Sequence, residues 1–533
     1  MLSEANKLNI TPQSPIHIDG NSLTLEDVER VARLRPPVLL SAPALAQLDH
    51  SRRAVEDVVQ SGAPVYGITT GFGKFKDVTI DPKDTQKLQR NLLLSHAAGV
   101  GPNFDTPVVR AALLLRANAL AKGYSGVRPQ VVTLLLDLLN KEVHPCVPEQ
   151  GSLGASGDLA PLAHLALVLI GEGSAEFRGE TLAGGQALVK AGLEPLVLEA
   201  KEGLALTNGT QIMSAMGALI VLEADRLVKM ADIIGAMSLE AQLGSSRAFN
   251  AQIHAARPHP GQIQSAQNLR LLLKDSGLIA SHANCPMVQD AYSLRCMPQV
   301  HGASRQAFKH AREVFEIEIN AATDNPLVFD DGIMYGGNFH GQPLAIVLDY
   351  LSVALAELAN ISERRTERLV NPALSNGLPA FLTKYGGLNS GYMIAQYTAA
   401  ALVSENKSLA HPASVDSIPT SANQEDHVSM GATAGRKARA ILQNVRRVLA
   451  IELLCAAQGL DFRLHEQTFC KGGEQHTGVA PGPGILAAYR LVREQIPFLD
   501  DDRELHSDIL KADQILQSGE LLNTVEAVLG PLA

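Results

Sequence analysis

The sequence contains no tryptophan, and aromatic residues make up only 4% of its 533 residues. β-Sandwiches depend on aromatic and β-branched residues in their strands, so this scarcity disfavours that class of fold. Alanine and leucine are abundant instead, and both residues favour helices. Hydrophobic residues make up 46% and charged residues 19%, a balance that supports a large buried core and argues against disorder. We therefore expect a mainly α-helical protein.

Clusters of basic residues are also absent, and the formal net charge is −10. Nucleic-acid binding needs clustered Lys and Arg, so we expect no such partner. The five cysteines are never spaced as Cys-x-x-Cys, which disfavours a disulfide framework and a zinc site and predicts reduced thiols. No uninterrupted apolar run reaches the ~18 residues of a membrane span, and the first residues lack a signal-peptide pattern. These absences predict a cytoplasmic protein without a membrane partner.

The pattern of helix starts and stops predicts two parts. The length exceeds the ~250–300 residues at which one core stops growing. Residues 1–210 form a predicted N-terminal domain that is rich in loops, carries short strands such as 16–18, and includes a capped helix after Ser22. Residues 211–533 form a predicted long-helix bundle with C-terminal helices. Predicted helices occupy 105–122, 129–140, 211–241, 305–322, 344–370, 391–410 and 431–458.

The segment Gly-Ser-Leu-Gly-Ala-Ser-Gly-Asp-Leu-Ala-Pro at 151–161 carries the most distinctive chemistry. Two interpretations are open. The segment is either a tight loop that enters a helix capped by Asp158, or a stretch whose backbone cyclises. In the second interpretation the amide nitrogen of Gly157 attacks the carbonyl of Ala155, a compression that small residues permit. Loss of the Ser156 hydroxyl then leaves a methylidene group, an electrophile that no ordinary side chain provides. The N-terminus of the following helix has a positive potential, which would favour negative charge that builds on this ring.

Other catalytic motifs do not match. A nucleophile elbow needs glycine two positions after its serine, where Asp158 stands. The segment 67–74 has the wrong spacing for a P-loop. No His-Glu-x-x-His sequence occurs and the histidines form no array of ligands, so we expect no metal.

With these residues in view, the chain resembles the histidine/phenylalanine/tyrosine ammonia-lyase family over nearly its whole length. Besides the segment around Ser156, seven further motifs occur in the family's order. They are YGITTGFG at 66–73, SHAAGVG at 95–101, KEGLALTNGTQ at 201–211, QDAYSLRC at 289–296, ATDNPL at 322–327, GGNFHGQP at 336–343 and the segment from SENKSLAHP to VSMG at 404–431.

This resemblance implies a 4-methylidene-imidazol-5-one group formed autocatalytically from Ala155, Ser156 and Gly157, with no external cofactor. It also implies a mainly helical homotetramer whose active sites combine residues from more than one subunit. Tyr66 matches the family's mobile-loop tyrosine and is a candidate base for the β-proton, although an ordinary phenol with a pKa of about 10 needs help at neutral pH. Arg295 matches the arginine that binds the substrate carboxylate.

The remaining matches concern the ring and the pocket. Asn208, Gln289 and Tyr292 match polar residues around the prosthetic ring and the substrate, with a satisfied buried hydrogen bond as the alternative role. Phe339 matches an aromatic residue that lines the pocket, although the residue alone would be assigned to the core.

The pocket residues favour histidine as the substrate. At the positions that match His96 and Glu425, phenylalanine-specific members of the family that the chain resembles carry an apolar residue and a glutamine. An imidazole and a carboxylate suit a substrate ring that both donates and accepts protons, whereas burying them unpaired beside a phenyl ring would be unfavourable. We therefore expect elimination of ammonia from L-histidine to give trans-urocanate. Whether the amine or the substrate ring adds to the electrophile stays open.

Three alternatives remain at this point. The nearest is a tyrosine ammonia-lyase or an aminomutase of the same family. A fumarase/aspartase-type lyase is disfavoured because the loop typical of that class, GSSxMPxKxN, is absent. The third is a helical scaffold whose Ala155-Ser156-Gly157 segment does not cyclise.

Overall fold

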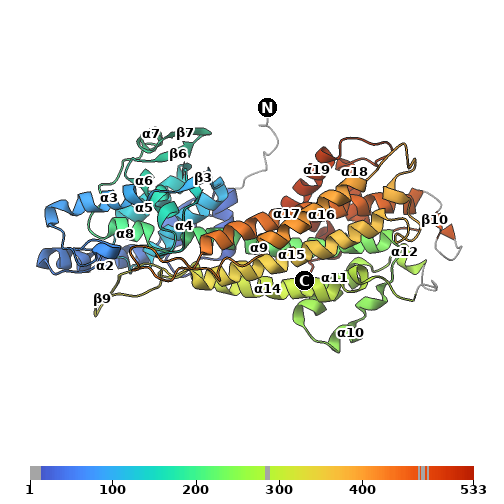
Figure 1. Ribbon diagram of the computed structural model, residues 1–533, viewed down its shortest axis with the longest axis horizontal. Helices are drawn as coiled ribbons and strands as arrows, with labels where there is room; N and C mark the ends of the chain where they lie inside the picture. Colours follow the sequence, from blue (N-terminus) through green and yellow to red (C-terminus); the bar gives the residue numbers. More distant parts are fainter. Residues whose placement is uncertain (1–13, 282–287, 466–467, 470–474, 477–478) are drawn as a thin grey trace. The chain divides into compact units, whose positions relative to one another are not determined.

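The computed structural model describes residues 14–281, 288–465, 468–469, 475–476 and 479–533. Helices dominate this part of the chain (Figure 1), and the mainly α prediction is confirmed. Contacts divide the chain into two compact units, each assembled from three separate stretches. Unit 1 comprises residues 1–222, 311–349 and 412–436, and unit 2 comprises 223–310, 350–411 and 437–533. All of residues 1–210 thus belong to unit 1, together with residues 211–222 and two later segments.

Four long helices contribute residues to both units: α9 (Gln211–Ala241), α14 (Met297–Glu318), α15 (Gln342–Val370) and α17 (Gly431–His465). The other helices of unit 1 are α1 (Leu25–Glu29), α2 (Ala42–Ser61), α3 (Thr85–His96), α4 (Thr106–Ala121), α5 (Pro129–Asn140), α6 (Leu159–Leu169), α7 (Gly184–Lys190) and α8 (Glu202–Thr207). In unit 2 they are α10 (Ala251–Ala255), α11 (Pro260–Leu272), α12 (Gly277–Ala280), α13 (Tyr292–Arg295), α16 (Met393–Leu409), α18 (Pro483–Gln495), α19 (Leu505–Gln517) and α20 (Glu520–Leu529).

The strands are short and form small separate sheets. β1 (Ile16–Ile18) pairs in parallel with β2 (Val38–Leu40), with Ile16 opposite Val38. The remaining pairs are antiparallel. They are β3 (Val100–Asn103) with β5 (Pro148–Gln150), β4 (Val143–Pro145) with β6 (Ser174–Phe177), β6 with β7 (Glu180–Ala183), β8 (Leu327–Phe329) with β9 (Gly332–Met334), and β10 (Thr468–Phe469) with β11 (Gln475–His476).

Several predicted elements have the bounds that the sequence indicated. Strand β1 and helices α5 and α9 cover the predicted residues. Two helix starts were wrong. The first helix begins at Leu25 rather than directly after Ser22, because Thr24 and Asp27 form a reciprocal capping box there. Helix α14 begins at Met297, ahead of the predicted 305, since Pro298 is accommodated in its first turn.

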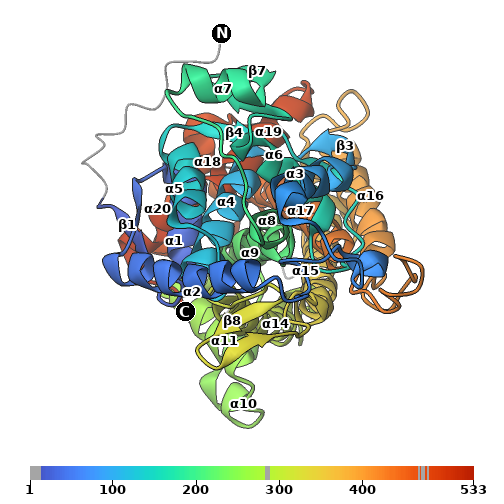
Figure 2. The same ribbon diagram turned by 90° about the vertical axis from the view of Figure 1, so that its left-hand side faces the viewer.

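Helix α9 forms the centre of the part of unit 1 that carries the candidate site. Residues 211–220 are all buried, so this part of the helix packs against protein on every side. A Cβ on Gly217 would lie 1.9 Å from the ring of Phe315 on α14, so glycine is what allows these two helices to pack closely. Around them, α3 contacts α6 and α8, α6 contacts α8, and α4 contacts α5 (Figure 2).

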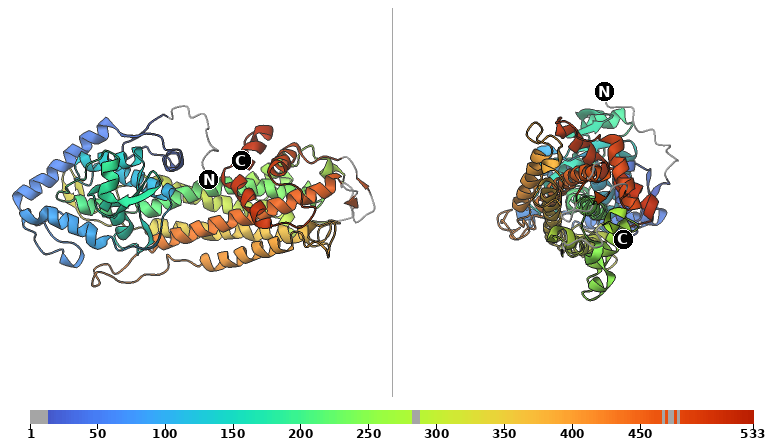
Figure 3. Two further views of the ribbon diagram at one scale, coloured as in Figure 1. Left: turned by 90° about the horizontal axis from the view of Figure 1, so that it is seen from above. Right: turned by 90° about the vertical axis from the view of Figure 1, so that its right-hand side faces the viewer.

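In unit 2 the last helices pack on one another. α20 contacts α18 and α19, and α11 contacts α18; α18–α20 form the dark red end of the colour scale in Figure 3. Among the described helices, only α15 meets a length and hydropathy test for a membrane span, and 61% of its apolar window is buried within the protein. More than half of this apolar window therefore packs against other parts of the protein.

Candidate active site

A cavity of about 1410 Å³ lies in unit 1, where several loops meet the ends of α3 and α8. The loops around residues 64–77, 335–340 and 421–427 line it, together with the loop that precedes α6. Seven of the residues that the sequence singled out line this cavity. They are Tyr66, His96, Ala155, Ser156, Asn208, Phe339 and Glu425.

The Ala155-Ser156-Gly157 segment forms a compact turn ahead of α6. Ser156 and Gly157 both have positive φ angles, of 50° and 83°, a conformation that is uncommon for a residue with a side chain. A Cβ on Gly157 would lie 2.1 Å from the carbonyl oxygen of Gly209, so only glycine fits at this position. The turn is thus tight, made of small residues and open to the cavity at Ala155 and Ser156. It fits the cyclic group expected from the sequence.

Asp158 is fully buried. The sequence predicted that its side chain caps α6, and the structure shows that it does not. Its side chain makes no capping hydrogen bond to α6. Instead, Oδ2 accepts hydrogen bonds from the backbone N–H groups of Ile212 (2.9 Å) and Met213 (3.0 Å), which lie in the first turn of α9. Burial raises the pKa of Asp158 to about 7, while the hydrogen bonds from Met213, Ser152 and Ile212 act against this rise. Asp158 therefore ties the turn to the start of α9.

Glu425 contacts the central residue of the turn. Its Oε1 accepts a hydrogen bond from Oγ of Ser156 at 3.1 Å, and its Oε2 accepts one from Oγ1 of Thr420 at 3.2 Å. The backbone of Thr420 and Glu425 forms an isolated antiparallel bridge that shapes this loop. A carboxylate thus stands directly beside the atom that the cyclisation hypothesis makes reactive.

His96 is the last residue of α3 and is half-buried at the cavity wall. Nδ1 of its ring is 3.0 Å from Oγ of Ser95. Burial lowers the pKa of His96, while the Leu92 carbonyl and the Glu425 carboxylate oppose this change. A neutral imidazole offers one donor and one acceptor, so His96 and Glu425 together form a polar wall that can bind a ring with both functions.

Tyr66 lies in the loop after α2, with its ring edge-on to that of Tyr335 at a centroid distance of 6.4 Å. Burial raises the pKa of the Tyr66 phenol, and the charges of Glu425 and Asp324 raise it further, while a backbone hydrogen bond from Gly73 opposes them. Within this unit, the surroundings of Tyr66 therefore disfavour the phenolate that a base would need.

Gln289, Tyr292 and Arg295 belong to unit 2 and line other cavities. The Arg295 guanidinium lies 4.7 Å from the ring centroid of Tyr292. Nε of Arg295 is buried and has no hydrogen-bond partner among the described residues. Gln289 and Arg295 line one of these cavities and Tyr292 lines another, and none of the three is among the residues that line the unit 1 cavity.

Comparison with known proteins identifies the family. The family model described as aromatic amino acid lyase matches residues 23–494, which is most of the chain. The chain belongs to the aromatic amino acid lyase family. Histidine ammonia-lyase from Gloeobacter violaceus is 58% identical, with coverage of 97% of this chain and 98% of that protein. Histidine ammonia-lyase from Myxococcus xanthus is 56% identical, with coverage of 96% and 98%.

Solved structures of family members show the same fold. Histidine ammonia-lyase from Trypanosoma cruzi aligns with a TM-score of 0.87 at 43% identity, covering 97% of this chain and 96% of that one. Tyrosine aminomutase from Streptomyces globisporus aligns with a TM-score of 0.91 at 40% identity, covering 98% and 100%. The helical architecture described above is thus the fold of aromatic amino acid lyases and aminomutases.

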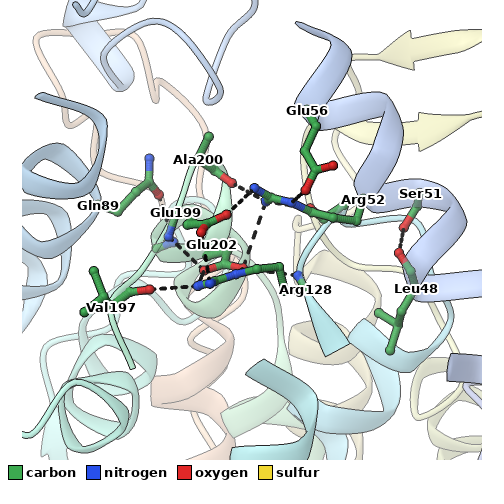
Figure 4. A network of polar contacts seen from close by, with 12 residues as sticks. Leu48, Ser51, Arg52, Glu56, Gln89, Arg128, Val197, Glu199, Ala200 and Glu202 are labelled. Atoms are coloured by element: carbon green, nitrogen blue, oxygen red, sulfur yellow. Dashed lines mark hydrogen bonds and ion pairs between the residues drawn. The ribbon is translucent and has the colours of Figure 1, made fainter. Parts of the chain in front are cut away.

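A buried network of charges holds α8, the helix that ends at the cavity (Figure 4). The carboxylate of Glu202, at the start of α8, accepts hydrogen bonds from Nε (2.8 Å) and Nη2 (2.7 Å) of Arg128. Arg52 from α2 contacts the neighbouring Glu199 at 2.8 Å. Oε1 of Gln89, on the helix that carries His96, accepts the N–H of Gly203 at 2.8 Å. This lyase therefore connects two cavity-lining helices through one polar network.

Several polar residues at or near the site were not predicted from the sequence. Tyr335 and His427 line the cavity, and a buried ion pair between Lys201 and Asp324 lies behind Asn208. Lys201 and Asp324 both lie inside motifs that carry the family resemblance. The indication that could have found them is a charged residue within an otherwise apolar segment, since such residues are rarely buried without a partner.

Proposed function

We propose that this chain eliminates ammonia from L-histidine to give trans-urocanate, the first step of histidine degradation. The observation that carries the proposal is the contact of Glu425 with Ser156, beside a half-buried His96. This places a carboxylate and an imidazole in the same cavity as the tripeptide of the expected electrophile. The high identity to histidine ammonia-lyases over nearly the whole chain supports the same substrate.

His96 and Glu425 recognise the imidazole ring of the substrate in this proposal. Glu425 accepts a hydrogen bond from the ring N–H, and neutral His96 supplies a complementary donor or acceptor. A phenyl ring could make no hydrogen bond with either side chain and would separate both from water, which is unfavourable for polar groups. Phe339 adds an apolar surface to the same pocket.

Ala155, Ser156 and Gly157 form the methylidene-imidazolone group, and no external cofactor is needed. This group supplies an electrophile that turns the amine of the substrate into a leaving group. The turn opens to the cavity ahead of the N-terminus of α6, whose N–H groups favour negative charge there. Asn208 lies close enough to orient the substrate or the ring, since it lines the same cavity.

Tyr66 takes the β-proton, and Arg295 binds the substrate carboxylate with its planar guanidinium. Because burial raises the pKa of Tyr66 within unit 1, a neighbouring positive charge is needed to favour its phenolate. We propose that Gln289, Tyr292 and Arg295 of another subunit supply this part of the site in a homotetramer. Gln289 and Arg295 line a cavity of unit 2, which supports a role of these side chains in binding.

We further propose that the enzyme is cytoplasmic. The described cysteines Cys146, Cys296 and Cys455 are free thiols, as expected in a reducing compartment. Cys285 and Cys470 lie outside the described residues.

The test is the growth of urocanate absorbance after L-histidine is added, with L-tyrosine and L-phenylalanine in parallel. Selective formation of urocanate supports the proposal. Formation of coumarate or cinnamate would keep the elimination and overturn the assignment of His96 and Glu425. A β-amino acid product would identify an aminomutase, the activity of the structurally similar tyrosine aminomutase.

A further inference from the structure

A buried ion pair lies directly behind Asn208. Nζ of Lys201, the residue that precedes α8, contacts Oδ2 of Asp324. The two side chains are 0% and 2% exposed, and neither lines the cavity. A buried pair of this kind contributes little net stability compared with apolar residues of similar size. Its position relative to the site therefore calls for a functional explanation.

Asp324 fixes the orientation of the Asn208 amide. Nδ2 of Asn208 donates hydrogen bonds to Oδ1 of Asp324 at 3.2 Å and to the carbonyl oxygen of Asn325 at 2.8 Å. Both neighbours accept, and only the amide nitrogen can donate to them. Oδ1 of Asn208 must therefore point the other way. It is buried, and it has no protein partner among the described residues.

Hydrogen bonds also fix the backbone of Asn208. Its N–H donates to the Leu204 carbonyl, and its own carbonyl accepts from Nη1 of the buried Arg116, each at 2.9 Å. The next residue, Gly209, accepts the N–H of Asp158 at 2.7 Å. Asn208 thus has a fixed position relative to the turn that contains Ser156. The residue lines the cavity, and Oδ1 is the acceptor of its side chain that has no protein partner among the described residues.

Lys201 holds the Asp324 carboxylate in place. Its Nζ contacts Oδ2 of Asp324, while Oδ1 of the same carboxylate accepts the hydrogen bond from Nδ2 of Asn208. A carboxylate accepts hydrogen bonds and does not donate them, so this arrangement keeps the amide nitrogen of Asn208 turned toward Asp324. Replacing Lys201 removes the partner of Oδ2, and the carboxylate and the amide that it orients are then free to move.

We propose that Lys201 and Asp324 are positioning residues for the reaction, which fix the Asn208 amide so that its Oδ1 accepts an N–H of the bound substrate. This proposal rests on the proposed function, because it requires a substrate with N–H donors. The two residues act through Asn208 and do not touch the substrate. The pair therefore links a buried charge to the geometry of the cavity.

The experiment is a double-mutant cycle that combines Lys201→Met with Asn208→Ala. In the wild-type background, Lys201→Met is expected to lower kcat/KM for histidine by about 10- to 100-fold, because a misplaced group impairs orientation. In the Asn208→Ala background the same substitution should change kcat/KM by less than about twofold. Effects that multiply in full would overturn the proposal, because Lys201 would then act by a route other than Asn208.

Two further variants keep the outcome decisive if Lys201→Met folds poorly. The double variant Lys201→Met/Asp324→Leu removes both buried charges, and full activity in it would contradict the proposal. Lys190→Met removes a lysine from an exposed ion pair with Glu180 and should behave as the wild type. Intact mass and thermal unfolding of each variant test ring formation and folding separately from turnover.

The same design separates this proposal from the proposed function. If the wild-type enzyme does not turn over histidine but converts tyrosine or phenylalanine, the proposed function fails and the cycle is measured with that substrate. Non-additivity with Asn208 would then still support the positioning role. Additivity would overturn it whichever substrate is used.

Discussion

At the scale of single residues, the site depends on contacts between small groups. Ser156 and Glu425 are 269 positions apart, yet their side chains are joined by a hydrogen bond of 3.1 Å. Gly157 admits the carbonyl of Gly209 at a distance that no Cβ would allow. These contacts place the expected electrophile beside the carboxylate that we propose recognises the substrate.

Ser156→Ala is expected to remove nearly all turnover, because the methylidene carbon derives from the serine side chain. Folding should be retained, since the Ser156 hydroxyl contacts Glu425 at a half-buried position and a methyl group fits there. Intact mass gives the check: the wild type should lack the mass of two water molecules, and the variant should not. A wild-type chain of full mass would contradict ring formation.

Glu425→Gln should lower kcat/KM for histidine by about 100-fold, the scale at which a buried polar group discriminates between ligands. The amide keeps the size of the carboxylate but loses its charge and half of its accepting capacity. Steady-state kinetics on histidine and phenylalanine measure the effect, with Glu180→Gln, at an exposed carboxylate that does not line the cavity, as the control. Unchanged histidine turnover in Glu425→Gln would rule out the recognition role.

At the scale of elements, two devices hold the helices around the cavity. Asp158 accepts the first N–H groups of α9, and the network of Arg128 and Glu202 holds the start of α8 (Figure 4). The ends of α6, α8 and α9 thus meet at the turn that contains Ser156. Both devices use buried charges, so their contribution to stability should be measurable.

Asp158 should make stability depend on pH. Its pKa is raised from 3.8 to about 7 in the folded protein. Between these values the folded state holds a proton that the unfolded chain has lost, so the free energy of unfolding falls as pH rises through this window, by a few kcal/mol. Urea unfolding of the wild type and of Asp158→Asn from pH 4 to 8 tests this. The free energy of unfolding of the wild type minus that of Asp158→Asn should decline up to about pH 7 and then stay constant.

Glu202→Gln should destabilise unit 1 by about 3 kcal/mol, because it leaves Arg128 and Arg52 without their buried partner. The Glu202 side chain is 0% exposed. Glu142→Gln serves as the matched control, since the Arg35–Glu142 pair is about half exposed and such pairs contribute little. Equal unfolding midpoints for the two variants would show that the network in Figure 4 does not support α8.

At the scale of the whole molecule, the predicted site residues fall into two groups. The residues around Ser156 line a cavity of unit 1, whereas Gln289, Tyr292 and Arg295 line cavities of unit 2. A homotetramer in which subunits share their active sites would bring the two groups together. Symmetric assemblies of identical subunits can build such sites because each interface is repeated.

Complementation tests this arrangement. Tyr66→Phe and Arg295→Ala should each be nearly inactive alone. When the two variants are co-expressed, mixed tetramers should regain part of the activity, because some sites then combine an intact Tyr66 with an intact Arg295. Light scattering gives the assembly mass, and a mixture of separately purified tetramers is the control. If activity does not recover in mixed tetramers, Tyr66 and Arg295 of each active site come from the same subunit.

The sequence by itself determined the features that depend on near neighbours along the chain. Long apolar segments, with Pro129 at the start of the first one, predicted α5 and α9 with the observed bounds, because helix formation is largely local. The small residues at 155–157 likewise indicated a tight turn. The family resemblance supplied the site residues, since no periodicity distinguishes a catalytic tyrosine from a packed one.

Only the tertiary structure decided which distant residues meet. From its neighbours in the sequence, Asp158 was predicted to cap α6, but in the packed protein its carboxylate accepts hydrogen bonds from the first turn of α9. The neighbours of Lys201 in the sequence also gave no reason to pair it with Asp324, which lies 123 positions later. Such partners are selected when charged groups are buried together and must satisfy one another. That selection depends on the packed core as a whole, which no local pattern contains.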